Sequence, residues 1–171
     1  QFIGVFNHSS FLDEVLVAIA MGTKSWTIIF AKEIRRIPVL GKMLRDHGIS
    51  VDREDQNSKK IAFIKSEKAI RDGKNFALFP EGKRLRPNDF EKGIVLYPFK
   101  LGAFSLASEH GLPIYPVVFF FPFFFKPRSG RWWFSPQTII IVNLEPIPTY
   151  GKDPKQIRDE VHNKMESTIK S

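Results

Sequence analysis

The chain has 171 residues, of which 43% are hydrophobic and 13% aromatic, with 26 Lys and Arg against 18 Asp and Glu. This length predicts one domain, and so apolar a composition excludes a disordered chain. The absence of Cys excludes disulfide frameworks and thiol nucleophiles. The net charge of +8 indicates an anionic partner, which is a nucleic acid, a phosphorylated substrate or an acidic membrane surface.

Strand-like apolar segments alternate with helical patterns along the chain. In chain order we predict strand 2–7, helix 11–21, strand 26–31, a short basic helical region 34–47, strand 49–51, helix 58–72, strand 75–79, a polar loop, helix 99–109, strand 114–119, strands 132–134 and 138–144, and helix 153–169. In the last helix Asp153 is a plausible N-cap, Pro154 follows at the first helical position, and apolar residues recur every four positions. The alternation predicts a single-domain α/β fold with a largely parallel mixed sheet and crossover helices.

No segment is long and regular enough to cross a bilayer as a helix. The longest apolar run, 112–125, contains three prolines, whereas a spanning helix needs about 20 apolar residues. The chain starts with Gln and enters an apolar stretch at once, without the basic region of a signal peptide. We therefore expect residues 1–171 to be one domain excerpted from a longer protein, with any N-terminal membrane anchor lying upstream.

The excess of positive charge is concentrated in residues 24–100, which hold 18 Lys and Arg against 10 Asp and Glu. A solvated basic face is one interpretation of this stretch. The other is that it binds the anion, and we favour the second because of the motifs that the stretch contains.

The sequence NHSSFLDE begins at Asn7, where a predicted strand gives way to a helix. In one interpretation Asp13 only complements the helix dipole, in the manner of a capping box. In the other the turn folds Asp13 back onto His8, where the carboxylate fixes the imidazole tautomer and leaves the second nitrogen free as a general base. His47 and Asp52 have the same spacing, but at about 3.3 Å per residue the extended segment between them would hold them roughly 16 Å apart.

The sequence FPEGKR follows a predicted apolar strand and opens a loop. Pro80 fixes the turn and Gly82 permits a close approach of the backbone. Arg84 is a candidate phosphate ligand because its guanidinium presents a fork of donors. Lys83 and Arg86 are further candidates, although both also fit an ordinary basic loop.

These two motifs, with GISVDR at 48–53 between them, resemble in type and order the sequence blocks of the glycerophospholipid acyltransferases, especially the 1-acyl-sn-glycerol-3-phosphate (lysophosphatidate) acyltransferases. The proline-bounded strand LPIYPV at 112–117 resembles the fourth block of that family. The resemblance runs from about residue 5 to 118. Two features depart from the family pattern: Lys83 stands where Thr is usual, and the loop 82–99 is longer. Both bear on the identity of the acceptor more than on the reaction.

The resemblance implies a direct acyl transfer without an acyl-enzyme intermediate. His8 would be the general base that activates the acceptor hydroxyl, and Asp13 would orient it. The acceptor phosphate would be bound by Arg53 and Arg84, with Lys32 as a further candidate, while Glu81 and Gly82 would shape the site. No metal and no cofactor are implied, apart from acyl-CoA or an acyl carrier protein as the acyl donor.

Residues 119–134 read FFFPFFFKPRSGRWWF, which combines seven Phe and two Trp with one Lys and two Arg. So many aromatics exceed what one sheet edge buries, and next to cations they suit a membrane interface or stacking on single-stranded nucleic acid. The resemblance favours the membrane. The predicted membrane contacts are Phe124, Lys126, Arg128, Arg131, Trp132 and Trp133.

The sequence thus predicts an enzyme of lipid metabolism that moves a fatty acyl group from a thioester to the hydroxyl of a lysophosphatidate-like acceptor, giving phosphatidate. We expect it at the cytoplasmic face of a membrane, on an anionic lipid surface, without nucleic acid as a partner. One alternative is transfer to another lysophospholipid or lipid acceptor. The other is a non-catalytic domain that binds anionic membrane or nucleic acid.

Overall fold

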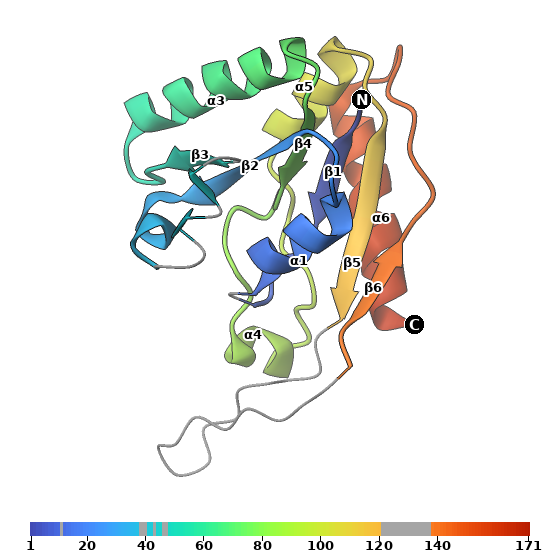
Figure 1. The fold of residues 1–171 in the computed structure, drawn as a ribbon. Coiled ribbons are helices and arrows are strands. Elements are labelled where there is room, and N and C mark those ends of the chain that lie inside the picture. The colour runs from blue at the N-terminus through green and yellow to red at the C-terminus, as the bar shows by residue number, and fades with distance from the viewer. Residues whose placement is uncertain (11, 38–40, 43, 46–47, 121–137) are drawn as a thin grey trace.

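The computed structural model describes residues 1–10, 12–37, 41–42, 44–45, 48–120 and 138–171 (Figure 1). Strands of these residues form one six-stranded sheet in the order β3-β2-β4-β1-β5-β6. Their bounds are β1 Ile3–Phe6, β2 Trp26–Ala31, β3 Gly48–Val51, β4 Asn75–Leu78, β5 Ile114–Phe120 and β6 Ile140–Asn143. The first five strands are parallel, and β6 pairs antiparallel with β5.

The predicted α/β class and largely parallel mixed sheet are confirmed by this topology. Strand β1 lies between β4 and β5, with Val5 opposite Leu78 on one side and Pro116 on the other. The carboxyl ends of the parallel strands therefore meet at one edge of the sheet, where ligand sites of such folds commonly lie. The predicted strand 132–134 lies outside the described residues.

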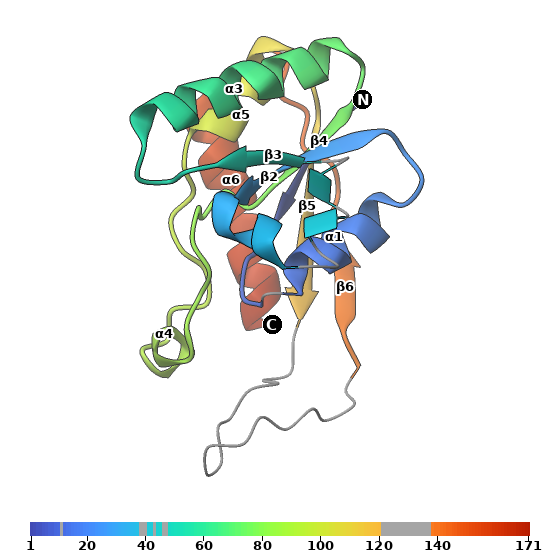
Figure 2. The same cartoon turned by 60° about the vertical axis from the view of Figure 1, so that its left-hand side comes forward.

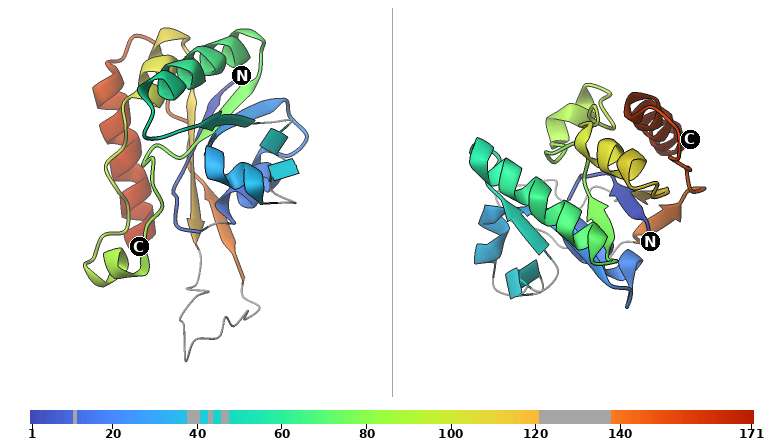
Figure 3. Two further views of the ribbon diagram at one scale, coloured as in Figure 1. Left: turned by 90° about the vertical axis from the view of Figure 1, so that its left-hand side faces the viewer. Right: turned by 90° about the horizontal axis from the view of Figure 1, so that it is seen from above.

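Helices cover both faces of the sheet (Figures 2 and 3). Their bounds are α1 Asp13–Met21, α3 Gln56–Arg71, α4 Pro87–Glu91, α5 Gly102–Glu109 and α6 Pro154–Lys170, with a 3₁₀ helix η1 at Lys32–Arg36. Seen from above in Figure 3, α3, α5 and α6 lie on one side of the sheet and α1 on the other. This is the layered arrangement expected when crossover helices bury their apolar faces on a parallel sheet.

Two apolar clusters hold these layers together. In the larger one, Ile3 and Ile114 of the sheet pack with Phe104 of α5 and with Ile157 and Val161 of α6, all fully buried. The smaller cluster lies on the face that α1 covers. Helix α6 begins as predicted, because the Asp153 side chain accepts a hydrogen bond from Lys155 N and Pro154 occupies the first turn.

Three local predictions differ from the structure. Residues 32–36 form a 3₁₀ helix at the start of the region that was predicted to be helical from 34. A short helix, α4, occupies part of the predicted polar loop. In α3 the spacing of apolar residues predicts the helix but not its buried face, since Ile61 and Ile64 are 52% and 62% exposed. The helix packs through Ala62, Ser66, Ala69 and Ile70 instead.

Among the residues that the structure describes, none of the helices has the length and apolar character needed to span a membrane.

Candidate active site

The segments that follow four strands meet at the carboxyl edge of the sheet and enclose a cavity of about 710 Å³. The strands are β1, β2, β3 and β4, which lie near one another only because the sheet order brings them together. The lining residues are His8, Glu14, Ala31, Glu33, Ile34, Ile37, Arg53, Lys83, Arg84, Arg86, Asp89 and Tyr97. The cavity therefore combines an imidazole, four cationic side chains and a short apolar segment.

Asp13 is directed back to His8. Its Oδ2 lies 2.7 Å from His8 Nδ1 and also accepts the backbone N–H groups of Ser9 and Ser10 at 2.7 and 2.8 Å. The carboxyl group is fully buried, and His8 is 5% exposed. A carboxylate in this position favours the tautomer with the proton on Nδ1, which leaves Nε2 able to take a proton from a bound hydroxyl.

The backbone around His8 is fixed from three sides. Asn7 extends β1 by one residue, because its side chain donates to Phe119 O at 3.0 Å and accepts from Phe119 N at 2.7 Å. Leu85 N donates to His8 O at 2.8 Å. The imidazole stacks on Phe79, with ring centroids 4.2 Å apart and an interplanar angle of 16°. These contacts hold the ring in one orientation before any ligand binds.

Glu81 acts on the backbone rather than on the cavity. Its two oxygens accept His8 N at 2.7 Å and Tyr97 N at 2.8 Å, so it joins the loop after β1 to the segment before α5. Burial raises the pKa of this carboxyl to about 7, against the opposing effect of both hydrogen bonds. Among the described residues, Glu81 is not part of the cavity lining, although the sequence placed it near the substrate.

Gly82 takes a backbone conformation that other residues rarely adopt, with φ of 69°. A side chain there would also have to displace the end of the Lys100 side chain. The glycine lets the chain turn immediately after Glu81 and carry Lys83 and Arg84 back to the cavity.

Arg53 and Arg84 reach the cavity from different strands, the first from the end of β3 and the second from the loop after β4. Lys83 also lines the cavity, with Nζ 3.6 Å from the centroid of the Tyr97 ring. The predicted candidate Lys32 is differently placed: it pairs with Asp52 and is not among the described lining residues. The available cations are therefore Arg53 and the group that follows Gly82.

Sequence reasoning missed seven residues of the cavity lining, namely Glu14, Ala31, Glu33, Ile34, Ile37, Asp89 and Tyr97. Glu14 adjoins Asp13, and its burial was not apparent because charged residues in a first helical turn are usually solvated. No sequence signal pointed to Tyr97, whose position depends on the fold of the loop 82–99.

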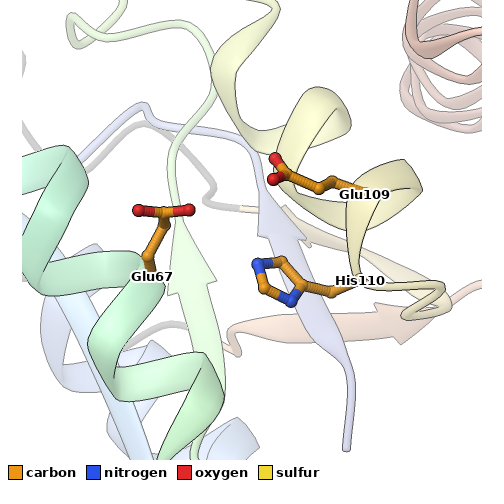
Figure 4. Close-up of side chains that lie close together, drawn as sticks. All are labelled: Glu67, Glu109 and His110. Atoms are coloured by element: carbon orange, nitrogen blue, oxygen red, sulfur yellow. The ribbon is translucent and has the colours of Figure 1, made fainter.

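A second cluster of potential ligands lies at the opposite edge of the sheet. Potential ligand atoms of Glu67, Glu109 and His110 lie within 4.8 Å of one another, and Figure 4 shows the carboxylates near the imidazole. Two of these groups are partly exposed, the third is exposed, and Glu67 also approaches Arg71 at 3.6 Å. We assign no role to this cluster in the chemistry at His8.

The predicted membrane contacts in 119–134 lie beyond Phe120, outside the described residues. His47 is likewise outside them.

Comparisons with known proteins agree with the fold and with the family that the sequence resembles. A family model described as "Acyltransferase" matches residues 1–120. An acyltransferase of Schizosaccharomyces pombe is 30% identical over 164 residues, covering 92% of this chain and 55% of that protein. The 1-acyl-sn-glycerol-3-phosphate acyltransferase beta of Homo sapiens is 29% identical over 176 residues, covering 96% and 58%. The chain thus spans about half the length of the curated relatives it matches.

A solved structure shares the fold. The 1-acyl-sn-glycerophosphate (LPA) acyltransferase PlsC from Thermotoga maritima aligns with a TM-score of 0.74 and 22% identity, covering 99% of this chain and 65% of that chain. Because the family model matches well over half of the chain, with His8, Asp13, Arg53 and Arg84 all inside the matched range, the chain belongs to the acyltransferase family.

Proposed function

We propose that this domain transfers a fatty acyl group from an acyl thioester to the free hydroxyl of a lysophosphatidate-like acceptor, giving phosphatidate. The observation that carries the proposal is the 2.7 Å contact of His8 with Asp13 in a cavity that also holds Arg53 and Arg84. A binding module has no need of an imidazole oriented by a buried carboxylate. The names of the relatives support the acceptor class.

The reaction requires one proton to be moved twice. His8 Nε2 takes the proton of the acceptor hydroxyl as its oxygen attacks the thioester carbonyl carbon. The tetrahedral intermediate then expels the thiolate, which receives the proton from the imidazolium as the carbon–sulfur bond breaks. Asp13 stabilises the imidazolium between these steps. The exchange needs no metal or cofactor besides the acyl donor, because the thioester supplies the activated acyl group and His8 carries the proton.

The acceptor phosphate would lie at Arg53 and Arg84. It does not react, so these side chains contribute positioning and binding more than rate. Lys83 stands beside them and adds a cation where the family pattern has Thr, which suits an acceptor of high negative charge.

We further propose that the domain works on an anionic membrane surface at its cytoplasmic face. Both acyl chains partition into lipid, so a site that joins them must open at the bilayer. The supporting observation is the aromatic and cationic sequence of residues 119–134. The donor is acyl-CoA or an acyl carrier protein, and we expect no nucleic acid partner.

The test is an acyl-transfer assay with radiolabelled acyl-CoA and acyl carrier protein donors against lysophosphatidate, other lysophospholipids and glycerol 3-phosphate, in mixed lipid micelles. The expected product is phosphatidate, formed by the parent protein and lost in His8→Ala. A product from a different lysophospholipid would transfer the proposal to that acceptor. Lipid or single-stranded DNA binding without any transfer would favour the non-catalytic alternative.

A further inference from the structure

One buried acidic side chain of the cavity has no place in the reaction described above. Glu14 follows Asp13 in the first turn of α1 and is 3% exposed. Its Oε2 is buried without a hydrogen-bond partner among the described residues. The other such atoms are Asp13 Oδ1, His110 Nε2 and His162 Nε2, and none of those three residues lines the cavity. Glu14 therefore lines the cavity and carries a buried carboxylate oxygen that is unpartnered among the described residues.

We propose that Glu14 is a third ligand of the acceptor phosphate, a neutral carboxyl group that donates a hydrogen bond to a phosphate oxygen held by Arg53 and Arg84. This inference rests on the proposed function, because it requires a phosphorylated acceptor in the cavity. It adds a residue that neither the sequence motifs nor the spacing of cations indicated.

The placement of Glu14 supports contact with the same group that the arginines bind. The charge of Arg84 lowers the pKa of Glu14. Burial lowers the pKa of Arg53, and the charge of Glu14 opposes that effect. No ion pair joins Glu14 to either arginine within 4 Å among the described residues. The three groups thus line one cavity without ion pairs to each other among the described residues.

Burial favours the protonated form of this carboxyl. It raises the pKa of Glu14, against the opposing effects of His8, of the hydrogen bond with the Glu14 backbone and of Arg84, while the adjacent Asp13 raises the pKa further. A bound phosphate adds negative charge beside the carboxyl and favours its protonated form. Only that form can donate, since an ionised carboxylate only accepts and would repel the phosphate.

The charged and titratable groups around Glu14 come from each neighbouring element. They are His8 after β1, Asp13 in α1, Glu33 in η1, Arg53 after β3 and Arg84 after β4. All of them, and the acceptor phosphate itself, are present in both the parent and a Glu14 variant, which differ only at residue 14. A difference in pH dependence between the two proteins therefore reports Glu14.

The experiment measures the KM of lysophosphatidate and of the acyl donor for the parent, Glu14→Gln and Glu14→Ala, over about pH 6 to 9. Glu160→Gln on α6, far along the chain and exposed, is the matched control for loss of a carboxyl group. Glu14→Ala is expected to raise the acceptor KM about tenfold at the acid end without changing the donor KM. Glu14→Gln keeps a hydrogen-bond donor in its amide group. At the acid end its acceptor KM is therefore expected to stay within about threefold of the parent's, and it should not rise with pH as the parent's does.

Three results overturn the inference. One is an unchanged acceptor KM in Glu14→Ala, and another is an equal loss for donor and acceptor, which marks a structural role. The third is a Glu14→Gln protein that loses acceptor affinity as strongly as Glu14→Ala at every pH, because Glu14 would then act as a carboxylate. An Arg84→Ala variant measured in parallel separates failure of this inference from failure of the proposed function. If both Arg84→Ala and Glu14→Ala leave the acceptor KM unchanged, the phosphate site itself is misassigned.

Discussion

Nδ1 of His8 lies 2.7 Å from Oδ2 of Asp13, and the same oxygen accepts the backbone N–H groups of Ser9 and Ser10. The turn between β1 and α1 therefore places three donors on one carboxylate oxygen. Asp13 stands in the first turn of α1 but does not cap it, since the N-cap position is Leu12 without a side-chain hydrogen bond. The Asp13 carboxylate therefore orients His8 rather than capping the helix.

The first prediction concerns this pair. His8→Ala should remove nearly all transfer, and Asp13→Asn should lower kcat by about 10³ to 10⁴, because an amide cannot favour the same tautomer or stabilise the imidazolium. Initial rates and thermal unfolding, measured together, check both. His110→Ala, at the opposite edge of the sheet, is the matched control and should keep the parent rate. Substantial activity in a folded His8→Ala protein would refute the mechanism.

The second prediction concerns phosphate binding. Arg84→Ala and Arg53→Ala should each raise the acceptor KM by about 10- to 100-fold, the effect of losing a charge-assisted hydrogen bond of about 1.5–3 kcal/mol. The donor KM should change far less. Arg71→Ala serves as the control because Arg71 is 69% exposed on α3 and does not line the cavity. Equal effects of all three substitutions would mean that the arginines act only through overall charge.

The third prediction uses the pKa of Glu81. The folded protein keeps a proton on this carboxyl up to about pH 7, whereas the unfolded chain releases it near 4.5. Between these values the folded state binds more protons, so Glu81 makes stability fall as pH rises, by on the order of 3 kcal/mol across the window. The free energy of unfolding from urea titrations at several pH values measures this. In Glu81→Gln the corresponding part of the pH dependence should vanish; an identical slope in both proteins would contradict the assignment.

The same substitution should also slow catalysis. The amide group of Gln offers only one acceptor oxygen, so either His8 N or Tyr97 N loses its partner. The expected result is a lower kcat at little change in either KM, because the base is displaced while the cavity remains.

The fourth prediction concerns the aromatic segment. Replacing Phe124, Trp132 and Trp133 together by Ser should weaken sedimentation with vesicles, and binding by the parent should strengthen with anionic lipid and weaken with salt. The matched control replaces three exposed apolar side chains of α3, namely Ile61, Phe63 and Ile64. Loss of binding in the control but not in the first variant would move the membrane contact to α3. Loss of affinity for single-stranded DNA instead would support the nucleic-acid alternative.

Helix boundaries and strand positions followed closely from local patterns. The last helix shows why: Asp153 and Pro154 specify its start, and Ile157, Val161 and Met165 recur on one face and are fully buried. The α3 helix shows the limit of the same method. Its isoleucines at 61 and 64 indicate a helix, yet they remain exposed while the buried residues of the helix are Ala62, Ser66, Ala69 and Ile70.

The sequence by itself determined the α/β class and the order of the three motifs, because both depend on neighbouring residues and on backbone periodicity. It gave the pairing of His8 with Asp13 as one of two interpretations, and the structure shows that pairing. The tertiary structure alone decided which distant groups share the cavity. Arg53 and Arg84 meet because β3 and β4 flank β2, a sheet order that no local pattern specifies. Packing at that edge likewise buried Glu14 and placed Tyr97, since burial depends on what lies opposite a side chain and not on what precedes it in the chain.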